Sequence, residues 1–473
     1  MQLRKKTKIL ATIGPVTQDA ATLTKLVKAG VNVLRLNFSH GDFAEHQSKV
    51  DAARIVEKRV GRPVAILQDL GGPKIRIGEF YKERVQLKKG SEFTLTTKKV
   101  TGDETKAYVN YARLPKELSK GDQVLLDDGK KRLEVLRTTK TDVACKVIVG
   151  GETKGRRGVN LPGANLSISA LTPKDKKDLE FGLANDVDFI SLSFVRRPGD
   201  VTQLRNILTK RNSRAMIIAK IETQEAIDNI DDIIALADGI MIARGDLAIE
   251  VPAEKVPELQ KEIIAKCNRF GKPVITATQM LESMIHSPVP TRAEVSDVAN
   301  AIFDGTDAVM LSEETTLGEY PLEAVQTMTR VALEVEGSYK ERYRLADGDP
   351  GEISTTDSVT TSVVETSHDI DAALIVAATQ TGFSARMISR HKPLSLILAL
   401  TPDEKTWRQL QLSFGAFPVL VGELESVDDI FGIVRKDALK FKLARKGDKV
   451  VVAAGVPFSK KRPETNMMLV EMV

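Results

Sequence analysis

Residues 1–345 alternate between short apolar runs and longer amphipathic segments. The apolar runs have the length of buried β-strands, and we predict eight of them, at 8–14, 32–38, 64–70, 188–194, 216–222, 239–243, 273–278 and 307–311. Segments of helical length lie between most of them, at 19–28, 44–60, 226–237, 257–270 and 291–303. Strand–helix alternation predicts parallel pairing, and near-continuous apolar strands predict burial on both faces of the sheet. The α/β class follows, and eight units fit a closed (β/α)₈ TIM barrel better than an open doubly wound sheet.

One interval in this pattern is far too long to be an ordinary connection. It spans 72–167, is rich in Thr, Val, Gly and Lys, and holds strand-like pieces at 91–97, 123–126, 133–138 and 143–149. We predict a small β-barrel domain inserted after the third strand of the large barrel, with glycine-rich hinges at 71–73 and 158–163. Because the loops after barrel strands carry the active site, we expect this domain to act as a lid.

The composition changes again after residue 345. The run Asp347-Gly-Asp-Pro-Gly-Glu352 is typical of a linker, and strand-like segments follow at 373–379, 396–401, 418–421, 449–454 and 468–473, alternating with helices. We therefore predict a barrel formed by 1–71 and 168–345, a lid at 72–167 and a C-terminal α/β domain at 346–473.

Composition narrows the class of protein. Hydrophobic residues make up 42% of the chain and charged residues 28%, which is typical of globular proteins. The 69 basic and 64 acidic residues give a charge of +5, and with 5% aromatic residues and no basic-aromatic patch we expect no nucleic-acid partner. No apolar run is long enough to span a membrane, and the basic N-terminus enters a strand-like segment rather than an apolar signal region. Cys145 and Cys267 lack metal-ligand spacing and nothing supports a disulfide between them, so we expect a cytoplasmic protein.

The strand predicted at 216–222 carries a lysine and a glutamate on one face. Lys220 and Glu222 are two residues apart, so in a strand they point to the same side, and their apolar neighbours place that side inside the fold. Asp246 follows the next strand along the chain. Buried charges are costly unless they are paired or bind a metal. A structural Lys–Glu ion pair is the alternative, but two neighbouring strands that each end in a carboxylate favour a divalent-metal site.

Polar side chains also end the other predicted strands. Arg35, Asn37 and Ser39 alternate with apolar residues after the second strand, and a guanidinium there suits a phosphate group. The remaining candidates are Asp69, Lys74 and Arg76 after the third strand and the hydroxyls of Thr276 and Thr278 at the end of the seventh. Since the carboxyl ends of barrel strands meet at one opening, this set indicates a multiply charged anion held with Mg²⁺, which prefers oxygen ligands. The scarcity of histidine argues against zinc.

Five motifs, in this order along the chain, resemble the pyruvate kinase family. They are Asn37-Phe-Ser-His-Gly41, Gly72-Pro-Lys-Ile-Arg76, Ile218-Ala-Lys-Ile-Glu222, Met241-Ile-Ala-Arg-Gly-Asp246, and Ala277-Thr-Gln-Met-Leu-Glu-Ser-Met284 with Pro290-Thr-Arg-Ala-Glu294. The resemblance runs from about residue 5 to the end of the chain. It implies phosphoryl transfer from phosphoenolpyruvate to ADP, giving pyruvate and ATP, with Mg²⁺ (or Mn²⁺) as cofactor and a homotetrameric assembly.

The resemblance also implies roles for individual residues. Glu222 and Asp246 match the Mg²⁺ ligands, and Lys220 matches the lysine that stabilises charge on the phosphoryl group and the enolate. Further matches are the phosphate contact Arg35, the substrate-carboxylate site Gly245, Asp246 and Thr278, and the nucleotide contacts Asn37, His40, Arg76 and Arg157. We expect Lys220, Arg35 and Thr278 to be catalytic, in a reaction that needs positioning and charge neutralisation rather than a covalent intermediate.

The chain departs from the family at two places. Members that require K⁺ hold it with groups matching Asn37, Ser39, Asp69 and a threonine at the position of Leu70, and they carry a glutamate at the position of Lys74. Because Leu70 lacks the hydroxyl and the Lys74 ammonium supplies a monovalent charge, we expect no K⁺ requirement. The second departure is Glu313, where the family has glycine, and the sequence offers no interpretation of it.

A strand, a hydroxyl-rich turn and a helix start follow one another in the C-terminal domain. The turn contains Thr379, Gln380, Thr381, Gly382 and Ser384, and this order of elements can cradle a phosphate with backbone N–H groups. It resembles the effector-phosphate loop of the family, and a basic segment at 459–462 could meet a second phosphate. A simple helix cap is the alternative. We expect allosteric regulation by a sugar phosphate or a nucleoside monophosphate.

Two other functions are compatible with parts of this pattern. A Mg²⁺-dependent lyase that forms pyruvate enolate uses a similar barrel but has no need for nucleotide contacts at Arg76 and Arg157. A non-catalytic metabolite sensor would bind its ligand in the C-terminal domain and have an inert barrel. This alternative is disfavoured because the barrel keeps the complete set of Lys220, Glu222, Asp246 and Thr278.

Overall fold

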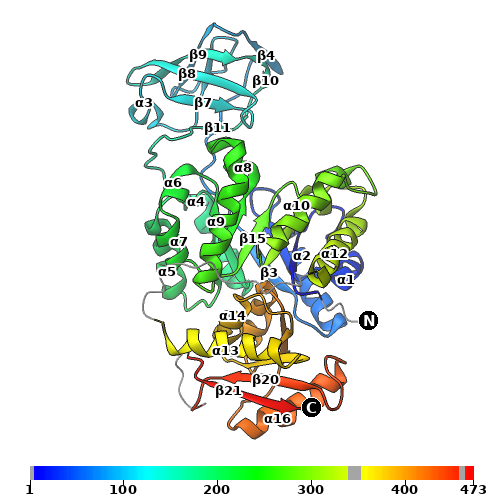
Figure 1. Cartoon of the computed structure of the whole chain (residues 1–473). Helices are drawn as coiled ribbons and strands as arrows, with labels where there is room; N and C mark the ends of the chain where they lie inside the picture. The colour runs from blue at the N-terminus through cyan, green and yellow to red at the C-terminus, as the bar shows by residue number, and fades with distance from the viewer. Residues whose placement is uncertain (1–4, 339–352, 458–463) are drawn as a thin grey trace.

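The chain forms three bodies stacked along one long axis. The structure is a computed structural model that describes residues 5–338, 353–457 and 464–473. The inserted β domain lies at one end, the barrel in the middle and the C-terminal domain at the opposite end (Figure 1). The two smaller domains therefore contact opposite ends of the barrel.

The central body is a closed barrel of eight parallel strands, which confirms the predicted fold class. Their order around the barrel is β1-β16-β15-β14-β13-β12-β3-β2. The strands are β1 (Lys8–Thr12), β2 (Val33–Asn37), β3 (Ala65–Asp69), β12 (Phe189–Leu192), β13 (Met216–Ile221), β14 (Gly239–Ala243), β15 (Val274–Ala277) and β16 (Ala308–Leu311). Alternate residues fill two cores, because Leu67 and Ile218 point into the barrel while Ile66 and Ile217 pack against the helices. This double burial explains the nearly continuous apolar strands.

Helices surround the barrel. They are α1 (Ala20–Ala29), α2 (Phe43–Val60), α4 (Pro173–Ala184), α5 (Pro198–Lys210), α6 (Gln224–Asp228), α7 (Ile230–Leu236), α8 (Arg244–Glu250), α9 (Val256–Arg269), α10 (Arg292–Phe303), α11 (Glu313–Thr316) and α12 (Pro321–Ser338). The single helix predicted at 226–237 is wrong, since the chain breaks at Asn229 between α6 and α7. The Asn229 amide donates to the carbonyls of Arg196 and Glu225, and such local bonds compete with helix continuation.

The insertion folds as a separate β domain with its own apolar core. It contains β4 (Arg84–Leu87), β5 (Glu92–Thr96), β6 (Lys106–Tyr108), α3 (Leu114–Glu117), β7 (Gln123–Leu126), β8 (Lys131–Thr138), β9 (Asp142–Val149), β10 (Gly151–Lys154) and β11 (Val159–Asn160). Six strands pair in the order β11-β7-β8-β9-β5-β6, and β10 pairs with β4. Cys145 in β9 and Cys267 in α9 are free and buried in different domains.

The C-terminal domain is a five-stranded sheet with helices. It contains α13 (Thr355–Asp369), β17 (Leu374–Ala378), α14 (Phe383–Ser389), β18 (Leu396–Thr401), α15 (Glu404–Gln409), β19 (Ala416–Leu420), α16 (Val427–Lys440), β20 (Lys449–Ala454) and β21 (Met467–Met472). The strand order is β19-β18-β17-β20-β21, with β21 antiparallel to β20 at the edge. The predicted linker and the boundary at 345/346 lie outside the described residues.

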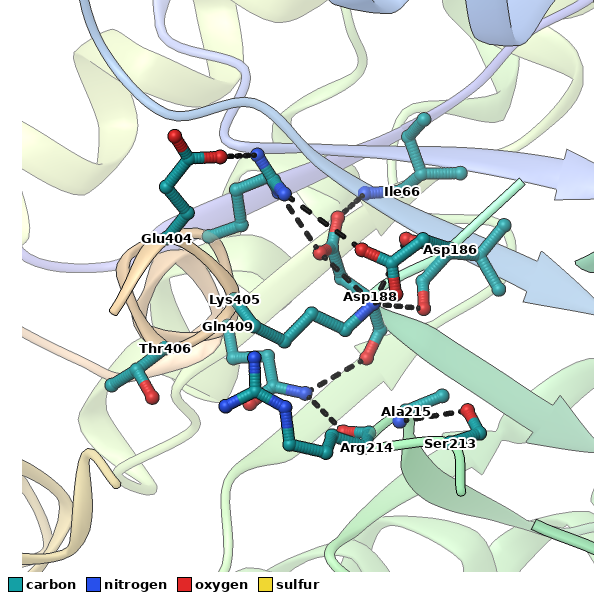
Figure 2. A network of polar contacts seen from close by, with 12 residues as sticks. Ile66, Asp186, Asp188, Ser213, Arg214, Ala215, Glu404, Lys405, Thr406 and Gln409 are labelled. Atoms are coloured by element: carbon teal, nitrogen blue, oxygen red, sulfur yellow. Dashed lines mark hydrogen bonds and ion pairs between the residues drawn. The ribbon is translucent and has the colours of Figure 1, made fainter. Parts of the chain in front are cut away.

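A buried polar network joins α15 to the barrel, just before β12 begins (Figure 2). Lys405 is 3% exposed, and its Nζ donates to Asp186 Oδ1 at 2.7 Å and to the carbonyls of Asp186 and Val187 at 2.8 and 2.7 Å. The buried Asp188 carboxylate accepts hydrogen bonds from Ile66 N and from Arg408 Nε at 2.8 and 3.3 Å. Because nearly every group in this network is paired, it fixes the C-terminal domain against the barrel.

Candidate active site

The lysine and the glutamate predicted on one face do lie together at the mouth of the barrel. Lys220 Nζ is 2.8 Å from Glu222 Oε1, donates to Ser193 Oγ at 2.7 Å, and lies 3.6 Å from Asp69 Oδ1. Glu222 Oε2 accepts a hydrogen bond from the backbone N–H of Phe194 at 2.7 Å. Glu222 is 1% exposed. Three neighbouring strands, β3, β12 and β13, thus position one buried cluster of charges.

The charges in this cluster stabilise one another. Burial alone would lower the pKa of Lys220, but Asp69 and Glu222 outweigh it and raise that pKa above its ordinary value. Burial would raise the pKa of Asp69, whereas Lys220 and Arg35 hold it below its usual range. Lys220 and Asp69 are therefore charged at neutral pH, although both are buried.

The residues present at the predicted metal site fit Mg²⁺. Burial raises the pKa of Glu222, and the negative charge of Asp246 raises it further. The positive charge of Lys220 lowers this pKa but does not outweigh them. Glu222 Oε1 and Asp69 Oδ1 are buried ion-pair oxygens that accept no hydrogen bond from the described residues. No group of three or more acidic, His or Cys side chains in the described part of the chain is arranged to hold a metal ion by itself. Two carboxylates suit Mg²⁺, which takes its other ligands from water and substrate oxygens.

Arg35 is held by two groups at the ends of β1 and β3. Its Nε and Nη2 lie 2.7 and 2.6 Å from Asp69 Oδ2, and its Nη1 donates to Thr12 Oγ1 at 2.8 Å. Asn37 Oδ1 accepts a hydrogen bond from Ser39 N at 3.0 Å, which stabilises the turn after β2. Of the groups predicted for a monovalent cation, Asp69 is thus already paired with Arg35 and Lys220.

Thr278 has a strained backbone next to the start of α8. Its φ of 73° is rare for a β-branched residue. Its Oγ1 accepts a hydrogen bond from Gly245 N at 2.8 Å and donates to Ala277 O at 2.6 Å. Thr278 and Gly245 therefore lie together, as the sequence indicated. Thr276 does not join them, because its hydroxyl is buried and bonds to Thr306 Oγ1 at 3.0 Å.

Sequence reasoning assigned no role to the residues that support this cluster. Arg244 pairs with both carboxylate oxygens of Asp297 at 2.6 and 2.7 Å and donates to Thr278 O at 2.9 Å. Ser193 and Phe194 contact Lys220 and Glu222 directly. The available signal was position: Ser193 and Phe194 lie at the end of a predicted strand, and Arg244 lies inside a conspicuous motif.

A cleft of about 470 Å³ opens between the inserted domain and the barrel mouth. Lys74, Arg76 and Arg157 line it from the hinges, and Asp246 lines it from the barrel. Arg157 Nε lies 3.2 Å from Asp127 Oδ1 within the inserted domain. The exposed Lys74 adds to the positive charge that lowers the pKa of Asp69. The cleft thus brings the hinge cations to Asp246, whereas Lys220, Glu222 and the exposed His40 do not line it.

The predicted effector loop forms the turn between β17 and α14. Gln380 and Thr381 are exposed, while Thr379, Gly382 and Ser384 are buried. Gly382 has a φ of 78°, and Ser384 Oγ accepts a hydrogen bond from Thr465 at 2.8 Å. The predicted basic segment at 459–462 lies outside the described residues.

The structure shows why a side chain is tolerated at Glu313. This residue is exposed, opens α11 and is not in the left-handed region, so the position does not require glycine. An acidic side chain in the first turn also interacts favourably with the helix dipole.

The parallel barrel with an inserted β domain, a C-terminal α/β domain and a Lys–Glu–Asp cluster at its mouth defines a barrel phosphotransferase. Two family profiles match the chain: "Pyruvate kinase, barrel domain" over residues 4–325 and "Pyruvate kinase, alpha/beta domain" over residues 357–471. The chain belongs to the pyruvate kinase family.

Individual relatives agree with this assignment over nearly all of this chain. A pyruvate kinase of Staphylococcus saprophyticus is 46% identical over 99% of this chain and 80% of its own length. One of Clostridium acetobutylicum is 43% identical over 99% of this chain and all of its own length. The crystal structure of a pyruvate kinase from Cryptosporidium parvum superposes with a TM-score of 0.94 at 36% identity, covering 99% of this chain and 96% of that one.

Proposed function

We propose that this chain transfers the phosphoryl group of phosphoenolpyruvate to ADP in a Mg²⁺-dependent reaction that gives pyruvate and ATP, the last step of glycolysis. The observation that carries the proposal is the buried Lys220–Glu222 pair, whose glutamate interacts with Asp246, a residue that lines a cleft together with several arginines. A site for two polyanions needs this combination of cations and metal-binding carboxylates.

The residues would divide the work as follows. Glu222 and Asp246 would hold Mg²⁺ or Mn²⁺, which when bound neutralises charge on the phosphoryl and enolate oxygens. Lys220 lies beside Glu222 and stabilises the same developing charge, and Arg35 binds the phosphoryl oxygens. The remaining groups bind substrate: the carboxylate at Gly245, Asp246 and Thr278, and the nucleotide at Asn37, His40, Arg76 and Arg157.

One assay separates this function from its alternatives. Pyruvate is measured from phosphoenolpyruvate with and without ADP, for the natural chain, for Lys220→Met and for Lys177→Met, which changes an exposed lysine of α4. We expect ADP-dependent pyruvate that Lys220→Met abolishes and Lys177→Met retains. Pyruvate without ADP would identify a lyase, and no pyruvate in either condition would favour a metabolite sensor.

We also propose that the enzyme does not require K⁺. In support, Lys74 contributes positive charge to Asp69, which in K⁺-requiring members would help to hold the ion. With saturating Mg²⁺, replacing K⁺ by Na⁺ or tetramethylammonium should leave the rate unchanged. The Lys74→Glu variant should gain a K⁺ dependence. A large loss of rate without K⁺ in the natural chain would refute the proposal.

We propose regulation through the loop at Thr379, Gln380, Thr381, Gly382 and Ser384. Support comes from the left-handed Gly382 before α14, which exposes the preceding turn. AMP and glucose 6-phosphate serve as probes of the two expected effector classes. If neither shifts the phosphoenolpyruvate saturation curve, the loop is structural.

We further propose a homotetramer in the cytoplasm, built from the three domains at 1–71 with 168–345, 72–167 and 346–473. Support for self-association comes from β21, an edge strand whose Val470 and Met472 are 48% and 62% exposed. No helix among the described residues is long and apolar enough to cross a bilayer. Sedimentation of the natural chain tests the tetramer.

A further inference from the structure

Arg196 is a buried cation at the edge of the cleft that forms no ion pair with the described residues. It follows β12, is 8% exposed and lines the cleft. Its guanidinium makes one long hydrogen bond, to Phe194 O at 3.4 Å, and forms no ion pair with any described residue. Its charge also acts on the buried Glu250 of α8, because it lowers the pKa of that carboxyl against the effect of burial. No carboxylate of the described residues is within ion-pair distance of the guanidinium, so Arg196 can still bind an anion on the side of the cleft.

Asp128 is an unpaired anion on the opposite wall of the same cleft. It lies in the turn between β7 and β8, is exposed, and its carboxylate makes neither an ion pair nor a hydrogen bond with the described residues. Its neighbour Asp127 is already paired with Arg157. Of the two acidic residues in this turn, Asp128 is thus the one whose charge is available.

The tip of the inserted domain already reaches the barrel beside these two charges. Asn160 Nδ2 donates to Glu250 Oε1 of α8 at 3.3 Å. A Cβ added to Gly129, the residue after Asp128, would lie 3.7 Å from Ile249 Cγ2 on the same helix. Arg196 and Asp128 therefore line the same cleft from different domains, next to a place where the two domains are already in contact.

We propose that Arg196 and Asp128 are positioning residues that form an ion pair when the inserted domain closes over bound nucleotide. The pair holds the closed lid, and with it Arg76 and Arg157, against the barrel mouth. Because Arg196 is already buried before the lid closes, its attraction to Asp128 is opposed by less new desolvation than in a pair formed from two exposed groups. The identity of the nucleotide as ADP rests on the proposed function. The closure of the lid through this ion pair rests only on the positions of Arg196 and Asp128 in the cleft. The competing role for Arg196 is direct contact with a ligand phosphate.

A charge exchange distinguishes the two roles. Asp128→Lys and Arg196→Glu are each expected to raise the KM for ADP about tenfold, with the KM for phosphoenolpyruvate changed less than twofold. The double variant, which restores the pair with reversed polarity, should return to within about threefold of the natural chain. Glu134→Lys is the matched control, since it reverses an exposed lid charge whose side chain makes no hydrogen bond or ion pair with the described residues, and it should behave as the natural chain. If the double variant is as impaired as Arg196→Glu, Arg196 binds ligand and the proposal is overturned.

A second measurement detects closure without turnover. Spin labels at Lys140→Cys in the lid and Asp232→Cys in α7 report the distance between domains, and the native cysteines are buried. Mg²⁺-ADP should add a short-distance population in the natural chain, which Asp128→Asn and Arg196→Gln both remove. These neutral variants replace the charge-reversed ones if Arg196→Glu does not fold. The Asp128→Asn/Arg196→Gln double variant should then lose no more of the short-distance population than either single variant does. Closure unaffected by both would overturn the proposal. Closure of the natural chain without any pyruvate production would refute the proposed function instead.

Discussion

We predict that the clamp between Arg244 and Asp297 makes catalysis depend on a residue that is outside the predicted site. Arg244 extends from the start of α8 and bonds to Asp297 of α10 through two nitrogens. The same guanidinium donates to the carbonyl of Thr278, whose backbone is left-handed. Replacing Asp297 by alanine leaves Arg244 with only long bonds, at 3.3 Å to Ala277 O and to Gln260 Oε1, besides its contacts at Thr278 and Met280. We therefore expect the guanidinium to shift and its bond to Thr278 O to weaken.

The magnitude follows from the contacts that are lost. A hydrogen bond to a charged group contributes about 1.5–3 kcal/mol, and a strained backbone at a functional residue stores about 1–3 kcal/mol that it can release by relaxing. The Asp297 side chain is 36% exposed, so water replaces part of the clamp. We therefore expect a loss of about 1.5–3 kcal/mol in transition-state stabilisation, which is about 10- to 150-fold in kcat/KM for phosphoenolpyruvate.

Steady-state kinetics of Asp297→Ala test this estimate. The control is Asp231→Ala, which removes an ion pair with Lys266 at 3.0 Å on the outer surface of the barrel. The control should stay within twofold of the natural chain. If Asp297→Ala also stays within twofold, the clamp does not hold Thr278 in its active conformation. A large change in melting temperature with unchanged kinetics would lead to the same conclusion.

Two further predictions concern the barrel and its contact with the C-terminal domain. Lys405→Met leaves buried acceptors unpaired and should lower the free energy of unfolding by about 3–5 kcal/mol. Urea titration followed by the fluorescence of Trp407, the only tryptophan, measures this loss, and Lys436→Met, which changes an exposed lysine, is the control. A loss below about 1 kcal/mol in Lys405→Met would contradict the prediction. Burial, and after it repulsion by Lys8, lowers the pKa of Lys5 from 10.5 to about 7 in the folded chain. Between pH 7 and 10.5 the unfolded chain therefore binds more protons at Lys5 than the folded chain does, so the stability of the fold rises with pH. The melting temperature should rise from pH 7 to 9, and an equal rise in Lys5→Met would refute the assignment.

Sequence periodicity predicts the barrel well because strand spacing and burial are local properties. Lys220 and Glu222 are two residues apart on β13, so a period of two suffices to place them on one face. The clamp joins residues 53 positions apart. The α15 network joins residues 219 positions apart. Neither pairing leaves a periodic signal, because each depends on how elements far apart in the chain pack after folding: two helices in the clamp, and a helix with the loop before β12 in the network.

The helix break at Asn229 illustrates the same limit at shorter range. The apolar pattern at 226–237 is compatible with one helix, and nothing in it marks the break. The break is fixed by the Asn229 amide, which bonds to Arg196 O from a different loop. The residue that ends α6 thus also holds the backbone of Arg196, so a local departure from helical structure contributes to the wall of the cleft.

The charge balance around Asp69 connects the departure at Lys74 with the rest of the site. Arg35 already bonds to Asp69 Oδ2 through two nitrogens, Lys220 is 3.6 Å from Oδ1, and Lys74 adds further positive potential. A monovalent cation placed here would gain one carboxylate and meet three positive side chains. Coulomb repulsion from those charges, with no hydroxyl at Leu70 to replace lost hydration, disfavours the ion. In Lys74→Glu two positive side chains face two carboxylates, so the net repulsion of a cation disappears, and this is why we expect that variant to acquire a K⁺ dependence.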